Sequence, residues 1–172
     1  MPSLLHAAVG MVAGRATARV HPGRLMVVLA LLAMLPDLDV IAFAFGIPYQ
    51  APFGHRGALH SVAAATLVGG LCSLDARAWR MSRMRMFAIV STVVASHGLL
   101  DAFTDGGLGI ALAWPLSNHR FFFSWRPIPV APIGGRILLS YGRHVLFMEL
   151  IWAVPLLVYA LWPRRPKPAE RS

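Results

Sequence analysis

LMVVLALLAMLPDLDVIAFAF, residues Leu25–Phe45, is an apolar run long enough to cross a lipid bilayer, yet it contains a proline and two aspartates. A transmembrane helix needs about 20 predominantly apolar residues. Pro36 should interrupt the helix, because it has no N–H to donate and the backbone groups that it frees need partners or a wet cavity. Asp37 alone could cap a restarted helix, but Asp37 and Asp39 together favour a bound cation.

Four other apolar segments accompany this run, with Gly, Pro and Arg between them. They are Pro2–Gly14, Ala58–Leu74, Met86–Phe103 and Val145–Trp162. The last is long enough to cross a bilayer unaided, the two before it are marginal, and the first is short enough to be a partial or interfacial helix. The stretch Thr104–Arg143, rich in Gly, Pro and aromatic residues, predicts loop with short interfacial pieces. We therefore expect an all-α, multi-pass transmembrane bundle of about five helices.

The composition agrees with a bilayer environment. Of the 172 residues, 57% are hydrophobic and 13% are charged, so the chain is more apolar and less charged than ordinary soluble domains. We expect one domain at residues 1–163 and a basic cytoplasmic tail at 164–172. The net charge of +9 does not indicate nucleic-acid binding, because the basic residues lie between apolar segments. Cys72 is the only cysteine, which excludes an internal disulfide and a thiolate site within one chain.

The basic residues predict how the chain is oriented. Short cytoplasmic loops collect Lys and Arg. With five crossing segments, three basic regions fall on one side of the membrane, and these contain Arg15, Arg19 and Arg24; Arg77, Arg80, Arg83 and Arg85; and Arg164, Arg165, Lys167 and Arg171. We therefore expect the N-terminus outside and the C-terminus in the cytoplasm. The unusual polar residues of the apolar segments then gather at the outer face.

Ionisable residues inside membrane segments are costly and rare, so each is a functional candidate. In SHGLLDAFTDGG, His97 and Asp101 are four residues apart and project from one face of the predicted helix. In GHRGALHS, His55 and His60 flank Arg56, which could bind an anionic oxygen. A helical His–Asp hydrogen bond and ordinary buried imidazoles are the structural alternatives. Carboxylate and imidazole without thiolate are the ligands expected for zinc, manganese or iron.

Two further ionisable residues lie in apolar segments. His6, in LLHAAVG, is a lone histidine on an apolar helix, which is usually structural, and it gains weight from the other histidines. Glu149 is the single acid of the last segment, and its burial cost makes it a candidate ligand, base or arginine partner.

The ordered motifs resemble a known family. The early histidine, PDLD, GHRGALHS, SHGLLDAFTDGG and WPLSNHRFFF together resemble the membrane-bound metal-dependent hydrolases, whose bacterial members include damage-inducible inner-membrane proteins. The resemblance covers His6 to about Trp152, with Leu5 and Leu59 in place of the family's usual Thr and small polar or aromatic residue. It implies a bacterial inner-membrane location. The metal ligands that it implies are His6, Asp37, Asp39, His55, His60, His97 and Asp101.

A second, distant resemblance in ligand order alone is to zinc-dependent phospholipase C and related zinc nucleases. It suggests hydrolysis of a phosphoester, with a membrane lipid or a lipid-linked phosphate as substrate. One or two divalent ions, zinc first and manganese or iron as alternatives, would acidify a water that attacks an ester or phosphoester. We expect Asp39 or Asp105 to act as base and Arg56 or Arg120 to hold negative charge, with Glu149 as a further candidate.

An aromatic-rich stretch lies on the predicted outer side. Trp114, Phe121–Phe123 and Trp125 could sit at the lipid interface and admit acyl chains. Simple interfacial anchoring is the alternative.

Two other functions fit the same residues. An ion or metal transporter also uses intramembrane Asp and His, although the chain is short for one unless it oligomerises. A non-catalytic membrane scaffold with a structural metal would fill every coordination position with protein ligands, whereas a catalytic site leaves one open. We expect a hydrolase whose partners are the bilayer and a lipid or phosphoester substrate, without nucleic acid. The chain is compatible with an oligomer.

Overall fold

The structure is a computed structural model that describes residues 3–132 and 138–163, so the expected tail at 164–172 lies outside the described residues. Within these ranges the chain is helical, without β-strands, and has two isolated bridges, Thr104–Ile128 and Ile110–Phe121. The helices, α or 3-10 (η), are α1 Ser3–Thr17, α2 Pro22–Met34, η1 Leu35–Phe45, η2 Ala58–His60, α3 Val62–Ser73, η3 Ala76–Trp79, α4 Arg83–Asp101 and α5 Ser140–Leu161.

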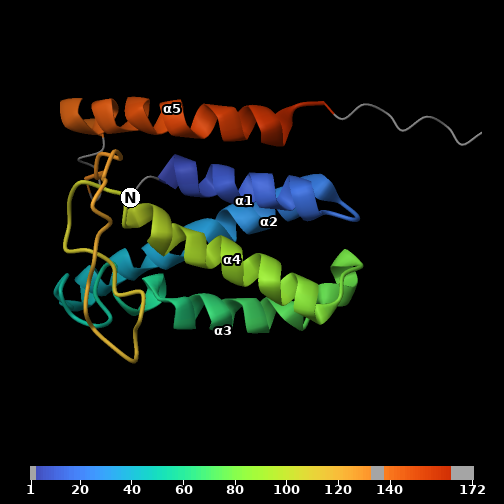
Figure 1. Ribbon diagram of the computed structural model, residues 1–172, viewed down its shortest axis with the longest axis horizontal. Coiled ribbons are helices and arrows are strands. Elements are labelled where there is room, and N and C mark those ends of the chain that lie inside the picture. Colours follow the sequence, from blue (N-terminus) through green and yellow to red (C-terminus); the bar gives the residue numbers. More distant parts are fainter. Residues whose placement is uncertain (1–2, 133–137, 164–172) are drawn as a thin grey trace, which may run out of the picture.

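The long helices lie side by side, with successive helices running in opposite directions (Figure 1). α1 packs against α2 and α5, and α3 packs against α4. The starts of α1, α3 and α5 therefore share one end of the bundle with the ends of η1 and α4. At the opposite end, Arg15 donates a hydrogen bond to Ala160 O, and Arg85 donates one to Thr17 O. The expected separation of the His and Asp residues from the basic loops is thus present in the fold.

Two helical stretches are long and apolar enough to cross a membrane, Pro22–Phe45 and Ser140–Leu161. They are not buried core helices, because only 33% and 22% of their apolar windows is buried. Leu31, Leu67 and Phe147 are 65%, 65% and 62% exposed, which is an apolar outer surface of the kind that a bilayer covers. α1 and α3 have 15 and 12 residues, which is shorter than a bilayer span, and α4 carries charged residues.

Pro36 changes the helix type within the first of these stretches. α2 ends at Met34, and the chain continues as the 3-10 helix η1, which ends at Phe45 and is followed by Gly46 with φ 71. The predicted interruption is confirmed. Asp37 does not act as the N-cap, since Met34 precedes η1 and no side chain caps it. Instead Asp37 and Asp39 are buried within η1.

α1 and α2 approach closely at two glycines of α1. A Cβ on Gly10 would collide with the backbone of Leu29 and Ala30, and a Cβ on Gly14 would collide with that of Met26. Small residues four apart let the backbones of membrane helices approach in this way. Because α1 and α2 are antiparallel, the contact brings the start of α1 beside the end of α2.

Replacing Gly10 with Leu should therefore loosen the bundle. We expect Gly10→Leu to lower the free energy of unfolding by about 1–3 kcal/mol, the usual cost of overpacking. The measurement is the thermal midpoint of detergent-purified protein, followed by circular dichroism. Gly70→Leu on α3 is the control, because nothing lies within 4 Å of a Cβ there. Equal losses for the two variants would contradict the close α1–α2 contact.

Candidate metal centre

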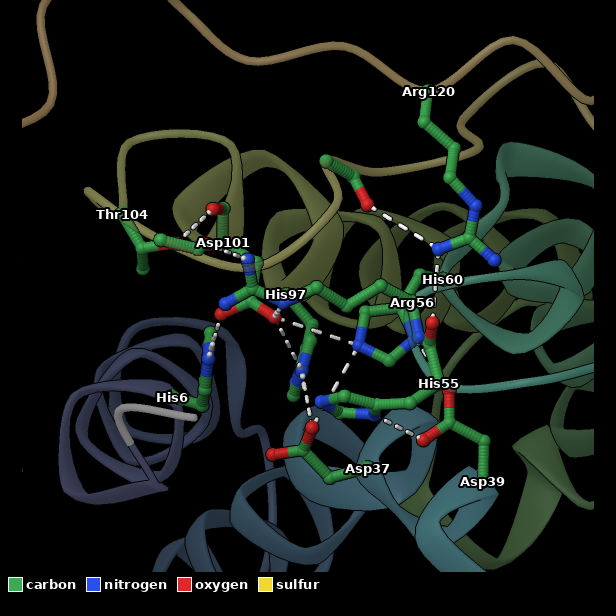
Figure 2. Close-up of polar contacts among 12 residues, drawn as sticks. His6, Asp37, Asp39, His55, Arg56, His60, His97, Asp101, Thr104 and Arg120 are labelled. Carbon is green, nitrogen blue, oxygen red and sulfur yellow. Dashed lines mark hydrogen bonds and ion pairs between the residues drawn. The ribbon is translucent and has the colours of Figure 1, made fainter. Parts of the chain in front are cut away.

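All seven residues that the sequence resemblance nominates lie in one buried cluster (Figure 2). Each is at most 7% exposed. Four segments supply them. They are His6 of α1, Asp37 and Asp39 of η1, His55 and His60 of the segment around η2, and His97 and Asp101 of the last turns of α4.

The local sequence shapes the segment between η1 and α3. A Cβ on Gly54 would collide with the carbonyl oxygens of residues 48 and 49, and a Cβ on Gly57 would collide with that of Pro52, so both positions require glycine. Between them Arg56 has φ 62, in the left-handed region. Ser61 then caps α3 by accepting a hydrogen bond from Ala64 N–H at 3.0 Å. This tight path turns His55, Arg56 and His60 inward.

The distances among four of these residues match those between ligands of one metal ion. His97 Nε2 lies 3.3 Å from Asp37 Oδ1 and 3.8 Å from Asp101 Oδ2. His60 Nε2 lies 3.6 Å from Asp37 Oδ1 and 3.5 Å from Asp101 Oδ2. Hydrogen bonds of this kind are usually shorter. Ligands at about 2.0–2.2 Å from zinc lie roughly 3.3–3.6 Å from one another in a tetrahedral site. These four residues can hold a metal ion, and we name them the central group.

His6 borders the central group. Its Nε2 lies 3.4 Å from Asp101 Oδ1, and its ring stacks on that of His97 at 3.7 Å between centroids. Neither of its ring nitrogens has a hydrogen-bond partner. The same is true of both oxygens of Asp37 and Asp101 and of Nε2 of His97 and His60. Buried polar atoms are seldom left unpaired, so a bound cation would account for this set.

The other nitrogens of the central histidines face hydrogen-bond acceptors. His97 Nδ1 is hydrogen-bonded to Ala33 O at 2.7 Å. His60 Nδ1 lies 3.1 Å from Asp39 Oδ2, which is an ion-pair contact without hydrogen-bond geometry. These partners favour a proton on Nδ1 and leave the lone pair of Nε2 directed at the central group. Second residues of this type orient metal-bound histidines in many proteins.

Asp39 connects the central group to the η2 segment. Its Oδ1 lies 2.6 Å from His55 Nδ1, and its Oδ2 accepts a hydrogen bond from Arg56 N–H at 3.0 Å. Asp39, His55 and His60 could themselves hold an ion, with His60 shared between the two groups. However, the Asp39–His55 distance is that of a direct hydrogen bond. These contacts suit Asp39 to orienting His60 better than to acting as a free base.

Arg56 contributes a fully buried positive charge. Its Nε lies 3.1 Å from Asp101 Oδ2, and its Nη1 donates to Gly106 O at 2.8 Å. Its Nη2 is buried without a hydrogen-bond partner. Three carboxylates and one guanidinium leave the cluster with two negative charges when its histidines are neutral. A divalent cation would balance this charge.

Arg120 and Asp105 lie outside the central group. Arg120 donates hydrogen bonds to four backbone carbonyls, those of Tyr49, Ala51, His55 and Gly109. Its guanidinium therefore ties two loops together. Asp105 is exposed and accepts a hydrogen bond from Val130 N–H at 2.8 Å. These contacts place both residues on loop backbone, and their roles in holding charge and as a base stay predictions.

Glu149 lies on α5, apart from the four segments that form the cluster. It is 1% exposed, and its Oε1 has no hydrogen-bond partner. None of the ion pairs that the cluster forms in the described residues includes it.

Some residues around the centre carry no signal in the sequence. Ala33 and Gly106 act through backbone carbonyls, which any residue possesses. Tyr49 packs its ring edge-on to His55, with 5.1 Å between centroids, and burial raises the pKa of its hydroxyl. Thr104 donates a hydrogen bond to Asp101 O at 2.7 Å and so completes the end of α4. In the sequence, the only indication of this role of Thr104 is its position three residues after Asp101, an expected ligand.

Comparison with known proteins gives a family and a relative. Residues 1–166 match the family described as YdjM inner membrane protein. The inner membrane protein YbcI of Escherichia coli (strain K12) is 42% identical over 172 residues, which covers 96% of this chain and 99% of the relative. No solved structure matches.

The central group makes a direct prediction about metal content. Purified protein should contain at least one equivalent of a divalent transition metal, and His97→Ala and Asp101→Asn should lose it because each removes a ligand. Asp39→Asn should weaken binding by about 10- to 100-fold, the usual effect of removing a residue that orients a ligand. Elemental mass spectrometry and competition with a chelating dye measure both effects.

The matched control is Asp105→Asn, which changes an exposed carboxylate and should keep wild-type metal. Wild-type protein with substoichiometric metal in every preparation would rule out the metal centre.

Proposed function

The chain belongs to the YdjM inner membrane protein family, and from this premise we propose that it is a membrane-bound hydrolase that cleaves an ester or phosphoester of a lipid or lipid-linked substrate. The observation that carries the proposal is the buried central group, whose ligand atoms face one another at metal-ligand spacing without hydrogen bonds. A membrane protein with its polar cluster at one end of the bundle is suited to a substrate whose reactive group lies at the lipid surface.

The donor set fits zinc, with manganese or iron as alternatives, because it combines imidazole and carboxylate without sulfur. When bound, a divalent cation supplies Lewis-acid polarisation and lowers the pKa of water. We assign one ion to the central group. His60 and His97 would hold it through Nε2, and Asp37 and Asp101 through one oxygen each.

The remaining polar atoms supply two further functions. Arg56 Nη2 has no partner in its buried position and can hold a negatively charged substrate oxygen. This contact would become stronger as negative charge develops on that oxygen in the transition state. Asp37 Oδ2 is buried without a hydrogen-bond partner, whereas Asp39 Oδ2 accepts a hydrogen bond from Arg56 N–H and Asp105 Oδ1 accepts one from Val130 N–H. We therefore assign proton transfer to Asp37, in place of Asp39 and Asp105.

Hydrolysis should depend on metal and on Arg56. Activity toward phospholipids and generic phosphoesters in detergent should disappear after chelation and return with metal. Arg56→Met should lower kcat by about 10²–10³-fold, the usual loss when a group that stabilises developing charge is removed. Arg56→Lys should recover part of the kcat that Arg56→Met loses.

Arg126→Met is the matched control for Arg56→Met, because Arg126 is exposed and stacks on Phe122. Each variant is compared at equal metal content. Full activity of an Arg56→Met variant that retains metal would contradict the assigned role. Inactivity of metal-loaded protein on every substrate of the panel would contradict the hydrolase.

One observation favours a second candidate, a scaffold with a structural metal. The central group offers four protein ligand atoms, which fill a tetrahedral site. The absorption spectrum of the cobalt-substituted protein separates the two functions. A coordination number above four, with a spectrum that changes on adding inorganic phosphate, supports the hydrolase. A tetrahedral spectrum that phosphate leaves unchanged supports the scaffold.

We further assign five membrane crossings to the chain, with the metal centre toward the outer face. Reporters fused within the Arg80 loop and after Ser172 should report the cytoplasm, because the Lys and Arg residues concentrate there. A reporter inserted at the exposed Ser117 should report the outside. A cytoplasmic signal at Ser117, or an outside signal at either of the others, would overturn this topology.

A further inference from the structure

An apolar cavity of about 310 Å³ lies beside the metal centre. Its wall includes Leu5 and Val9 of α1, Leu100 of α4, and Trp152 and Leu156 of α5. The loop that follows α4 contributes the rest, including Trp125. All of the residues that form the wall are apolar or aromatic. The volume falls at the lower end of the range for small-molecule sites, which is about 300–1,000 Å³.

The cavity shares two short stretches of chain with the metal centre. Leu5 precedes His6, and Leu100 precedes Asp101. His6 and Asp101 contact each other through Nε2 and Oδ1 at 3.4 Å, while their neighbours form the cavity wall. α1 and α4 therefore separate a polar compartment from an apolar one. A molecule that occupied both would have a polar end and a hydrocarbon end.

The position of the cavity indicates which kind of molecule would occupy it. α5 forms one side, and this helix is long and apolar enough to cross a membrane. Trp125 and Trp152, which belong to the wall, are 65% and 41% exposed, so the cavity reaches the outer surface. In a bilayer that surface meets lipid chains, and water does not stably fill an apolar cavity.

We propose that this cavity binds one acyl chain of a membrane lipid and thereby directs the lipid's ester or phosphoester group toward the central group. The proposal rests on the proposed function for the fate of the head group, but the binding of the chain stands by itself. It names the substrate class as a lipid with a long hydrocarbon chain. It also explains why an apolar wall directly adjoins a charged cluster.

A photoreactive lipid tests the binding directly. Protein is reconstituted in vesicles of unlabelled phosphatidylglycerol that contain a trace of the same lipid with a diazirine at the end of one acyl chain. After irradiation, mass spectrometry locates the labels. We expect saturable labelling of peptides containing residues 5–9, 100–103 and 152–156, above that of Leu67 and Leu71 on the outward face of α3.

Filling the cavity should prevent this labelling. Val9→Phe should lower it by about tenfold, because the added ring displaces several methylene contacts. Val154→Phe is the matched control, since Val154 lies on α5, is 47% exposed and is not part of the wall. Leu156→Phe replaces Val9→Phe should the latter fail to fold.

The outcomes separate this proposal from the proposed function. His97→Ala lacks a metal ligand and should still label, because the cavity does not depend on the ion. Saturable labelling without hydrolysis would uphold the cavity and overturn the hydrolase. Hydrolysis with labelling spread evenly over outward faces would uphold the hydrolase and overturn the cavity.

Two further results would also overturn the proposal. One is equal cleavage of short- and long-chain substrates that Val9→Phe leaves unchanged. The other is labelling that falls as the protein-to-lipid ratio rises, which would identify a second copy of the chain as the occupant.

Discussion

The constraint on which the structure depends is the burial of three carboxylates in an apolar bundle. Asp101 is fully buried, and Asp37 and Asp39 are nearly so. An isolated buried carboxylate would cost several kcal/mol even after relaxation, so each needs positive charge or hydrogen-bond donors. Asp39 obtains donors from the segment around η2, and Asp101 obtains the guanidinium of Arg56. The charge that remains on the central group is what a divalent cation would neutralise.

The fold meets this constraint by bringing the same end of several helices together. The 3-10 helix after Pro36 carries two aspartates, and the two glycines around Arg56 let the next segment turn beneath them. Gly10 and Gly14 hold α1 against α2, so that His6 reaches Asp101. Small residues and helix irregularities, which weaken an isolated helix, here position the polar side chains.

Much of this arrangement could be predicted from the sequence, because hydrophobic segments and their alternation decide which ends meet. The apolar segments lie within a few residues of α1 to α5, and the break at Pro36 follows from its missing N–H. The role of each residue within the cluster could not be predicted in the same way. Whether Asp39 binds a metal or orients His60 depends on which ring nitrogen faces it, and spacing along the chain does not encode that.

Other features escaped prediction for a related reason. Arg120 binds backbone carbonyls of distant loops, and a carbonyl is common to every residue. Asp105, four residues after Asp101, falls beyond the end of α4, so the loop carries it to the surface. The number of crossings is harder to predict, because α1 and α3 are shorter than a full span and α4 carries charged residues.

The four segments that form the cluster also fix when it can assemble. Its residues extend from position 6 to position 101, so the last of them leaves the ribosome only after more than half of the 172 residues has been translated. Until α4 is inserted, Asp37 lacks its contact with His97, and His6 lacks its contact with Asp101. α5 arrives afterwards and covers α1. The polar cluster therefore cannot be complete before α4 is present, and α5 supplies none of its residues.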